Sequence, residues 1–230
     1  VICEKPSQAR NIAAALGGAV NKTFVYNSET YILTPLAGHV VGIAEPGKQD
    51  AKWAIKKDSK GKMMFSHDTP LPIIPEKLKY TLNDSRSKEI VDRVKALVAE
   101  HDIKPENIIN CADADREGSL LVANFVKEVL KFPASKMRRI WITAESEAGY
   151  KTAFADIKEP SFDAGRVAAG LCRSRADWVH GMSSSRAVIG SVGRVVTPVL
   201  KIIVDAYRKH MDASVSTYFR VTGTALDNVF

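Results

Sequence analysis

Short apolar stretches alternate with helical patterns along the first 158 residues of this 230-residue chain. The short stretches predict strands, and the others carry apolar residues three or four positions apart, as helices with one buried face do. The expected strands are Val1–Cys3, Asn107–Cys111 and Arg139–Thr143, with a hairpin of Thr23–Tyr26 and Thr30–Thr34. The expected helices are Ser7–Leu16 with Ser7 as N-cap, Ser85–Glu100, Gly118–Leu130 and Ser146–Ile157. Such alternation favours parallel βαβ units, so we expect an α/β fold whose parallel sheet has flanking helices.

The pattern changes near residue 158, where strands give way to two long predicted helices, Ala164–Gly181 and Val195–Met211. Met182–Arg194 between them is rich in Ser, Gly and Arg, which indicates a link. Glu45–Pro75, within the first part, is rich in Lys, Gly and Pro and predicts a long excursion from the core. Thr217–Thr224 alternates as a strand does. We therefore expect an α/β domain at 1–158, a mainly α-helical segment at 159–214, and the start of an incomplete β domain at 215–230.

The composition limits the class of protein. With 45% hydrophobic and 26% charged residues, the chain is globular rather than disordered or fibrous. No apolar run reaches the roughly 18 residues of a membrane span. Three scattered cysteines without a C-x-x-C pair argue against zinc and favour a reducing compartment. A net charge of +7 permits a polyanionic partner. Because the chain lacks an initiator Met and both ends are strand-like, we expect part of a longer protein.

An acidic cluster follows the predicted strand that ends at Cys111. Asp113, Asp115 and Glu117 alternate along the chain, and Gly118 then opens a helix. In an extended backbone, residues two apart project to one side, so the three carboxylates would point together from the carboxyl end of the strand. Ligands bind at that end in open α/β sheets. Close carboxylates repel one another unless a cation neutralises them, and hard oxygen ligands suit Mg²⁺. The alternative is a solvated acidic turn at a helix N-terminus.

A fourth carboxylate, Glu4, directly follows the first predicted strand. If the two strands are parallel neighbours, Glu4 reaches the same sheet edge as the acidic cluster. Neighbouring negative charges would then raise its pKa, which suits a general acid. The adjacent Lys5 would offset the charge or hold a phosphate. Taken alone, this segment is also compatible with a plain surface loop between a strand and a helix.

These two motifs, Glu-Lys-Pro-Ser at 4–7 and Asp-Ala-Asp-Arg-Glu-Gly at 113–118, resemble the Toprim domain of type IA DNA topoisomerases. Other segments of that family follow in the same order and cover nearly the whole chain. They are Gly38-His39, Leu-Pro-x-x-Pro at Leu71–Pro75, Arg-x-x-x-Asp-Trp-x-x-Gly at Arg173–Gly181, Ser185–Ala187 and Ser191–Pro198. Thr197-Pro198 is closer to the topoisomerase III branch. Two positions depart from the pattern: Ser119 stands where Glu or Gln is frequent, and Val196 where Gln is usual.

The resemblance implies an enzyme that breaks, passes and rejoins single DNA strands without ATP, through a 5′-phosphotyrosyl intermediate. Glu4 would be the general acid, and the implied ligands of Mg²⁺, or of Mn²⁺, are Glu4, Asp113, Asp115 and Glu117. No nucleotide cofactor is expected, and the partner is DNA, with a single-stranded segment preferred. The implied location is intracellular: cytoplasm or nucleoid in a bacterium, nucleus in a eukaryote. The implied DNA-binding residues are Lys5, His39, Arg173, Asp177, Arg186, Ser191 and Arg194. Asp177 is expected to orient an arginine, and His39 either contacts phosphate or supports the turn.

The nucleophile of this family is a Tyr in an Ile-Thr-Tyr-x-Arg setting, and none of the six tyrosines here has that setting. The isolated chain is therefore expected to be inactive, with the nucleophile outside it. Three alternatives stay open. A haloacid-dehalogenase-type phosphohydrolase also uses Asp-x-Asp, but it usually has Thr or Val where this chain has Glu117. Another Toprim enzyme, a primase or nuclease, would share the carboxylates but not the Arg-x-x-x-Asp-Trp helix. A non-catalytic DNA-binding fragment is the third.

Overall fold

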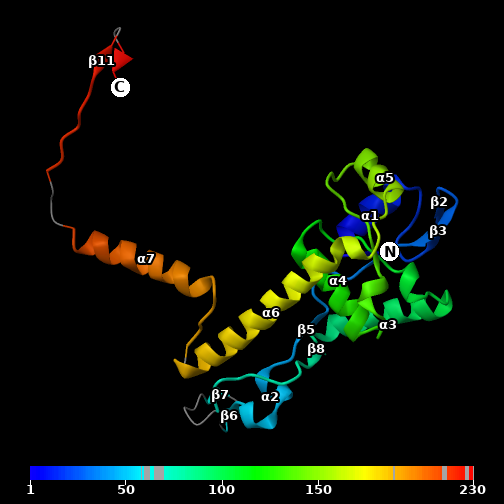
Figure 1. Ribbon diagram of the computed structural model, residues 1–230, viewed down its shortest axis with the longest axis horizontal. Coiled ribbons are helices and arrows are strands. Elements are labelled where there is room, and N and C mark those ends of the chain that lie inside the picture. The colour runs from blue at the N-terminus through cyan, green and yellow to red at the C-terminus, as the bar shows by residue number, and fades with distance from the viewer. Residues whose placement is uncertain are drawn as a thin grey trace. The chain divides into compact units, whose positions relative to one another are not determined.

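The computed structural model describes residues 1–57, 59, 63–64, 70–188, 190–213, 217–225 and 228–229. Two compact units follow one another along the chain, Val1–Gly190 and Ser191–Phe230 (Figure 1). The first contains the main sheet and most of the helices, and the second contains one long helix and a short hairpin. Across the ranges just given, no helix is long and apolar enough to cross a bilayer.

A four-stranded parallel sheet organises the first unit, in the strand order β10-β9-β1-β4. The strands are β1 (Ile2–Cys3), β4 (Thr34–Pro35), β9 (Ile109–Asn110) and β10 (Arg138–Arg139). Ile2 lies opposite Thr34 on one side and opposite Asn110 on the other, while Arg139 lies opposite Asn110. All three pairings are parallel, which confirms the α/β fold expected from the sequence.

Helices cover both faces of this sheet: α3 (Ser85–Glu100) and α4 (Arg116–Glu128) on one, α1 (Pro6–Ala15) and α5 (Glu147–Ala155) on the other. The other helices are α2 (Pro46–Gln49) and α6 (Ser161–Ala187) in the first unit and α7 (Val196–Met211) in the second. Ile2 and Ile108 pack with the apolar faces of α3 and α4. Cys3 and Ile109 pack with those of α1 and α5. Since successive strand residues point to opposite faces, adjacent residues supply two separate cores.

Smaller elements connect these parts. They are the antiparallel pairs β2 (Thr23–Tyr26) with β3 (Glu29–Ile32), β5 (Val41–Ile43) with β8 (Tyr80–Leu82), and β6 (Lys56–Lys57) with β7 (Met63–Met64), and the 3₁₀ turns Ala51–Trp53, Pro105–Asn107 and Ala134–Lys136. The first pair confirms the hairpin expected from the sequence. Its turn residues Asn27 and Ser28 both have positive φ, as a two-residue hairpin turn of type I′ requires.

Element ends in the first unit differ from the sequence expectation. Helix α1 begins at Pro6 with Lys5 as its N-cap and no side-chain cap, so the expected cap by Ser7 is wrong. Proline suits the first helical position because the amide that it lacks has no partner inside the helix. The expected strand Asn107–Cys111 contracts to β9, and the expected strand Arg139–Thr143 contracts to β10. Apolar character therefore extends further along the chain than the pairing between strands does.

The later part of the chain also departs from expectation. Helix α6 continues to Ala187, so the first residues of the expected link Met182–Arg194 are helical. In the second unit, the expected strand Thr217–Thr224 is wrong, because 217–223 lie outside any strand. A hairpin of β11 (Thr224–Ala225) and β12 (Asn228–Val229) follows instead.

The excursion at Glu45–Pro75 builds a third small core on helix α6. Trp53 and Ile73 are buried together with Trp178 of that helix. Arg186, also buried, donates from Nη1 to the carbonyl oxygen of Trp53 at 2.5 Å. The last turns of α6 thus pack against the excursion. This packing explains why the helix continues beyond Gly181, where the sequence pattern predicted its end. The part of the excursion at 58, 60–62 and 65–69 lies outside the described residues.

Close packing of α6 on α4 centres on Gly170. A Cβ atom at Gly170 would lie 3.1 Å from Cβ of Leu120 and 3.3 Å from the backbone oxygen of Arg116. A Cβ atom at Gly165, in the same helix, would meet no atom within 4 Å. The two glycines therefore form a matched pair that differs only in the closeness of α4.

We expect Gly165→Ala to raise the free energy of unfolding by about 0.5–1 kcal/mol, because alanine loses less backbone entropy in a helix. Gly170→Ala gains the same propensity but must displace α4, so we expect it to be less stable than Gly165→Ala by about 1 kcal/mol or more. Urea denaturation of both variants measures this difference. Equal stabilisation by the two substitutions would contradict the close helix contact.

Candidate active site

The pairing of β1 with β9 brings the two sequence motifs together at the carboxyl edge of the sheet. Lys5 Nζ lies 2.5 Å from Asp113 Oδ2 and 4.0 Å from Glu4 Oε1. Gln8, a buried residue that the sequence did not single out, joins the same two segments. Its Nε2 donates to Asp113 Oδ1 at 3.3 Å, and its Oε1 accepts from the amide of Glu4 at 3.3 Å. Glu4 and Asp113 are therefore neighbours, as the sequence predicted.

The other two carboxylates are placed by the start of helix α4, which begins at Arg116. Asp115 is the N-cap, and its Oδ1 accepts from the amide of Gly118 at 2.7 Å. Glu117 lies in the first helical turn, with its Oε1 3.0 Å from His39 Nε2. The expectation that Asp113, Asp115 and Glu117 project together from an extended backbone is wrong, because the helix begins inside the motif.

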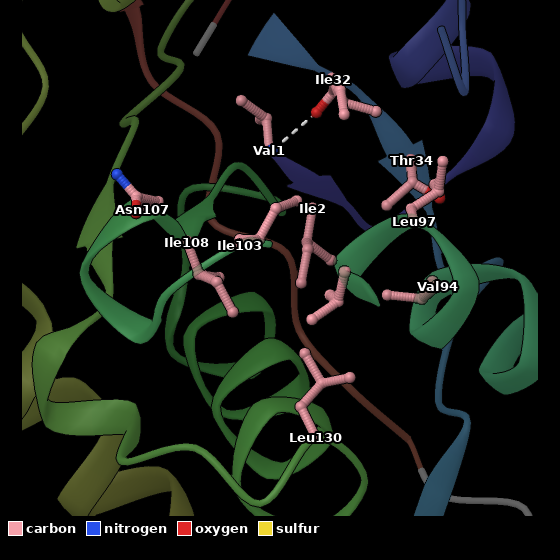
Figure 2. A pocket seen from close by; sticks show the side chains of 11 residues that line it. Val1, Ile2, Ile32, Thr34, Val94, Leu97, Ile103, Asn107, Ile108 and Leu130 are labelled. Carbon is pink, nitrogen blue, oxygen red and sulfur yellow. Dashed lines mark hydrogen bonds between the residues drawn. The ribbon is translucent and has the colours of Figure 1, made fainter. Parts of the chain in front are cut away.

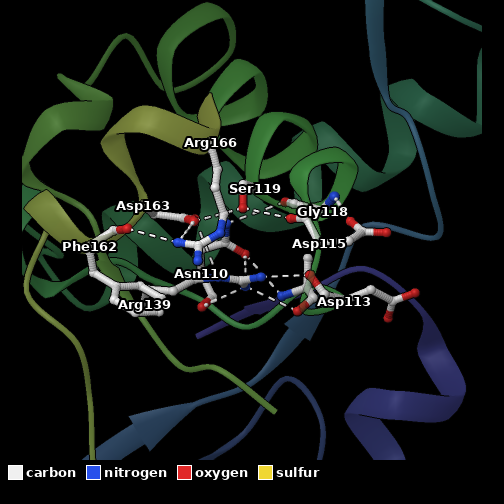
Figure 3. Close-up of polar contacts among 10 residues, drawn as sticks. Asn110, Asp113, Asp115, Gly118, Ser119, Arg139, Phe162, Asp163 and Arg166 are labelled. Carbon is white, nitrogen blue, oxygen red and sulfur yellow. Dashed lines mark hydrogen bonds and ion pairs between the residues drawn. The ribbon is translucent and has the colours of Figure 1, made fainter. Parts of the chain in front are cut away.

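A buried arginine, which the sequence did not single out, donates hydrogen bonds to the backbone of this loop (Figure 3). Arg139 is fully buried, and its Nη1 lies 2.9 Å from Asn110 Oδ1 and 3.0 Å from the carbonyl oxygen of Ala112. Its Nη2 donates to the carbonyl oxygen of Asp113 at 2.6 Å. The signal in the sequence was a charged residue inside an apolar stretch, since a buried charge requires partners.

The counter-charge of Arg139 comes from the first turn of α6. Asp163 is buried, and its Oδ2 lies 3.3 Å from Arg139 Nε, an ion pair without the alignment of a hydrogen bond. Burial lowers the pKa of the Arg139 guanidinium, and the charge of Asp163 opposes that shift. Ser119 Oγ lies 2.8 Å from Asp163 Oδ1 and 2.7 Å from the carbonyl oxygen of Asp115. Ser119, which departs from the family pattern, thus joins α4, α6 and the acidic loop.

The predicted DNA-binding residues are spread more widely. On α6, the Nε atom of the exposed Arg173 lies 3.6 Å from Asp177 Oδ2, one helical turn away. Arg186 is buried on the backbone of Trp53 rather than exposed beside Arg173. Ser191 and Arg194 belong to the second unit.

A small pocket in the first unit lies at the other end of the sheet, near the amino ends of β1 and β4 (Figure 2). Its volume is about 40 Å³, and most of its lining is aliphatic, with Ile2, Val94 and Leu130 among the side chains around it. None of its lining side chains is ionisable, so it offers no side-chain acid or base. The carboxyl edge of the sheet is the better candidate.

Comparisons with known proteins show which family the chain belongs to. Residues 1–144 match the family model described as the Toprim domain, which is more than half of the chain. The chain belongs to the Toprim family. Residues 161–229 match a second model, described as DNA topoisomerase.

Curated relatives of this Toprim chain carry the name DNA topoisomerase 3. The protein from Bacillus cereus is 29% identical over 235 residues, covering 100% of this chain and 30% of the relative. The protein from Bacillus thuringiensis (strain Al Hakam) is 30% identical over 96% of this chain and 29% of the relative. The protein from Staphylococcus aureus (strain MRSA252) is 30% identical over 88% of this chain and 27% of the relative. The chain thus spans about 30% of the length of these relatives.

Membership of the Toprim family implies a divalent metal ion, and the donor set at this edge fits one. Four carboxylates supply hard oxygen ligands, and the charge of Asp113 already disfavours ionisation of Glu4. As the side chains lie, no group of three His, Cys, Asp or Glu residues in the described ranges is gathered for a metal. Lys5, His39 and the amide of Gly118 each engage one carboxylate instead. The ligand set therefore stays a prediction.

The electrostatics of the edge centre on Glu4. Its burial raises the pKa of this carboxyl, the nearby charge of Asp113 raises it further, and Lys5 opposes both. The hydrogen bond to Asp113 raises the pKa of Lys5 in turn. A carboxyl that holds its proton more tightly than usual beside a cationic group is suited to donate a proton to a departing oxygen.

The raised pKa of Glu4 predicts a pH-dependent effect of Glu4→Gln. The unfolded pKa is about 4.3, so ionisation above the higher native pKa lowers the stability of the folded state, and this penalty fades as pH falls towards about 4. We expect the variant to be more stable than the parent at pH 8, with a difference that shrinks in acid. Urea denaturation across this range measures it.

Glu147→Gln is the matched control, because Lys151 lowers the pKa of the exposed Glu147 carboxyl. We expect that variant to be the less stable partner at pH 8, opposite in sign to Glu4→Gln. If the difference in unfolding free energy between the parent and Glu4→Gln is the same at all pH values, the pKa of Glu4 is not raised in the folded state and the interpretation is wrong.

Proposed function

We propose that this chain is the amino-terminal part of a type IA DNA topoisomerase, which breaks, passes and rejoins single DNA strands without ATP. The observation that carries the proposal is the meeting of Glu4 and Asp113, with Lys5 between them, at the carboxyl edge of a Toprim sheet. The match of 161–229 to the DNA topoisomerase model supports this function over another Toprim enzyme, such as a primase or nuclease.

Glu4 transfers the proton in this mechanism. The carboxyl donates it to the 3′-oxygen that leaves when the strand is cut, and the carboxylate takes it back when the strand is rejoined. Burial and Asp113 keep the proton on Glu4 at higher pH than usual, which supports the donor role. Lys5, held by Asp113 and largely exposed, can turn towards the scissile phosphate and screen its charge.

Mg²⁺, or Mn²⁺ in its place, would be held by Asp113, Asp115, Glu117 and the ionised form of Glu4. When bound, the cation neutralises phosphate charge and orients the phosphodiester. Lys5 and His39, which contact two of these carboxylates, would also be placed to contact phosphate. Glu4 would hold the cation only in its ionised form and would donate a proton only in its protonated form.

Side chains on helix α6 bind the phosphate backbone of single-stranded DNA. Arg173 binds phosphate, and Asp177, one turn along the helix, fixes its guanidinium. Ser191 and Arg194 are proposed to bind DNA from the second unit. For Arg186 we propose an indirect role, because its guanidinium is buried on Trp53 and anchors the excursion to α6.

We expect the 230-residue chain to bind single-stranded oligonucleotides with Mg²⁺ but neither to cut them nor to form a covalent adduct. Its tyrosines are Tyr26, Tyr31, Tyr80, Tyr150, Tyr207 and Tyr218. In the first unit, Tyr26 and Tyr31 pack on Phe154, and Tyr150 is buried. Without an aligned nucleophile, the gain from positioning, roughly 7–11 kcal/mol, is lost.

Denaturing electrophoresis of an end-labelled oligonucleotide after incubation with the chain tests this expectation. A protein-linked band that requires Mg²⁺ would identify a nucleophile among the six tyrosines and overturn the assignment of the missing one. The intact parent protein is the positive control and should give that band.

Phosphate contact by Arg173 predicts a change in salt dependence. For Arg173→Ala we expect the slope of log K against log salt to fall by about 0.7 for single-stranded DNA of any sequence. Lys95→Ala, which removes an exposed charge on α3, is the control and should leave the slope unchanged. Fluorescence anisotropy in a salt series measures both. Parental salt dependence in Arg173→Ala would count against phosphate binding there.

A further inference from the structure

Arg139 grips the backbone of the acidic loop at three places. Its two terminal nitrogens reach the carbonyl oxygens of Asn110, Ala112 and Asp113 at 3.2, 3.0 and 2.6 Å. Nη1 also reaches the side-chain oxygen of Asn110, which itself accepts from the amide of Ala112. Figure 3 shows the guanidinium of Arg139 beside Asn110 and Asp113. A fork of fixed, planar donors is the feature that distinguishes arginine from lysine.

The grip determines where Asp113 lies. Its carbonyl oxygen is held by Arg139 from within the sheet, while its carboxylate is held by Lys5 and Gln8 from the side of α1. Backbone and side chain of this one residue are thus fixed by two separate elements. Neither Lys5 nor Gln8 could orient the carboxylate if the backbone behind it were free to move.

The other end of Arg139 fixes the loop to two helices. Its Nε pairs with Asp163 at the start of α6, and Asp163 reaches Ser119 of α4. Arg139, Asp163 and Ser119 are all buried. Charge neutralisation therefore comes from Asp163, and loop geometry comes from the terminal nitrogens, so the two effects of the guanidinium can be separated by mutation.

We propose that Arg139 is a positioning residue that sets the affinity of the acidic loop for a divalent cation, by fixing the backbone from Asn110 to Asp113. This inference rests on the proposed function, because it needs a metal at that loop. Arg139 itself touches neither cation nor DNA. Groups that orient ligands from behind typically change metal affinity by 10–100-fold when they are replaced.

The decisive variant is Arg139→Lys, which keeps the buried charge but has one nitrogen where Arg139 has two, so it cannot reproduce both the Nη1 contacts with Asn110 and Ala112 and the Nη2 contact with Asp113. We expect the Kd for Mn²⁺ to rise about tenfold or more, measured by isothermal titration well below the unfolding temperature. A purely structural arginine would lower the unfolding temperature but leave the Kd of the folded protein unchanged. Parental Mn²⁺ affinity in folded Arg139→Lys therefore overturns the proposal.

Two controls separate the grip from general damage. Arg138→Lys makes the same exchange at the preceding residue of β10, and we expect it to bind Mn²⁺ with the affinity of the parent. Asp163→Asn removes the ion pair but leaves the carbonyl contacts, and we expect the Kd to stay within about threefold of the parent, below the range for ligand-orienting groups. If Asp163→Asn weakens binding as much as Arg139→Lys, loss of the buried pair explains the result and the proposal is wrong.

A further variant covers the case in which Arg139→Lys does not fold. Asn110→Ala removes one of the contacts of the guanidinium and should raise the Kd in the same direction by a smaller factor; parental affinity in the folded variant overturns the proposal. If the unmodified chain binds no Mn²⁺, the metal site of the proposed function fails, and this inference fails with it. If the unmodified chain binds Mn²⁺ and the variants match it, only the inference fails.

Discussion

The parallel pairing of β1 with β9 is the constraint on which the candidate site depends. Each strand has only two residues, yet Ile2 and Asn110 lie opposite one another in a sheet covered on both faces. Parallel strands end at the same edge, so the residues that follow them must meet. Glu4 and Asp113 are distant in the chain and become neighbours for this reason alone. The apolar side chains of the two strands, divided between two cores, hold the pairing in place.

Bringing carboxylates to one edge is electrostatically unfavourable, and neighbouring groups offset much of this repulsion. Lys5 neutralises Asp113, His39 contacts Glu117, and the amide of Gly118 holds Asp115. Lys5 also lies 4.0 Å from Glu4, but burial and the charge of Asp113 outweigh it and raise the pKa of this carboxyl. Glu4 is also the residue for which a bound proton is useful in the proposed chemistry. These contacts offset part of the repulsion among the carboxylates at this edge.

Helix α6 connects the parts of the first unit. Its first turn carries Asp163, which neutralises the buried Arg139 beneath the acidic loop. Its middle packs closely on α4 at Gly170, and its last turns hold Trp178 and Arg186 against the excursion. One continuous helix thus extends from the back of the acidic loop to a separate small core. Removing either member of the buried Arg139–Asp163 pair would leave an uncompensated charge, at a cost of about 3–5 kcal/mol.

Periodicity and strand-end rules are local or topological, so they were enough to predict the α/β class and the order of the main elements. They also predicted the meeting of Glu4 with Asp113, on the condition that their strands are parallel neighbours. The sequence could not locate the start of α4 inside the acidic motif, since an Asp-x-Asp-x-Glu run is compatible with both extended chain and a capped helix. It also missed Arg139, whose partners come from β9, the acidic loop and α6. Burial of Arg186 likewise depends on a distant segment. Only the tertiary structure decides which charges are buried and what neutralises them, because that depends on neighbours brought together from distant parts of the chain.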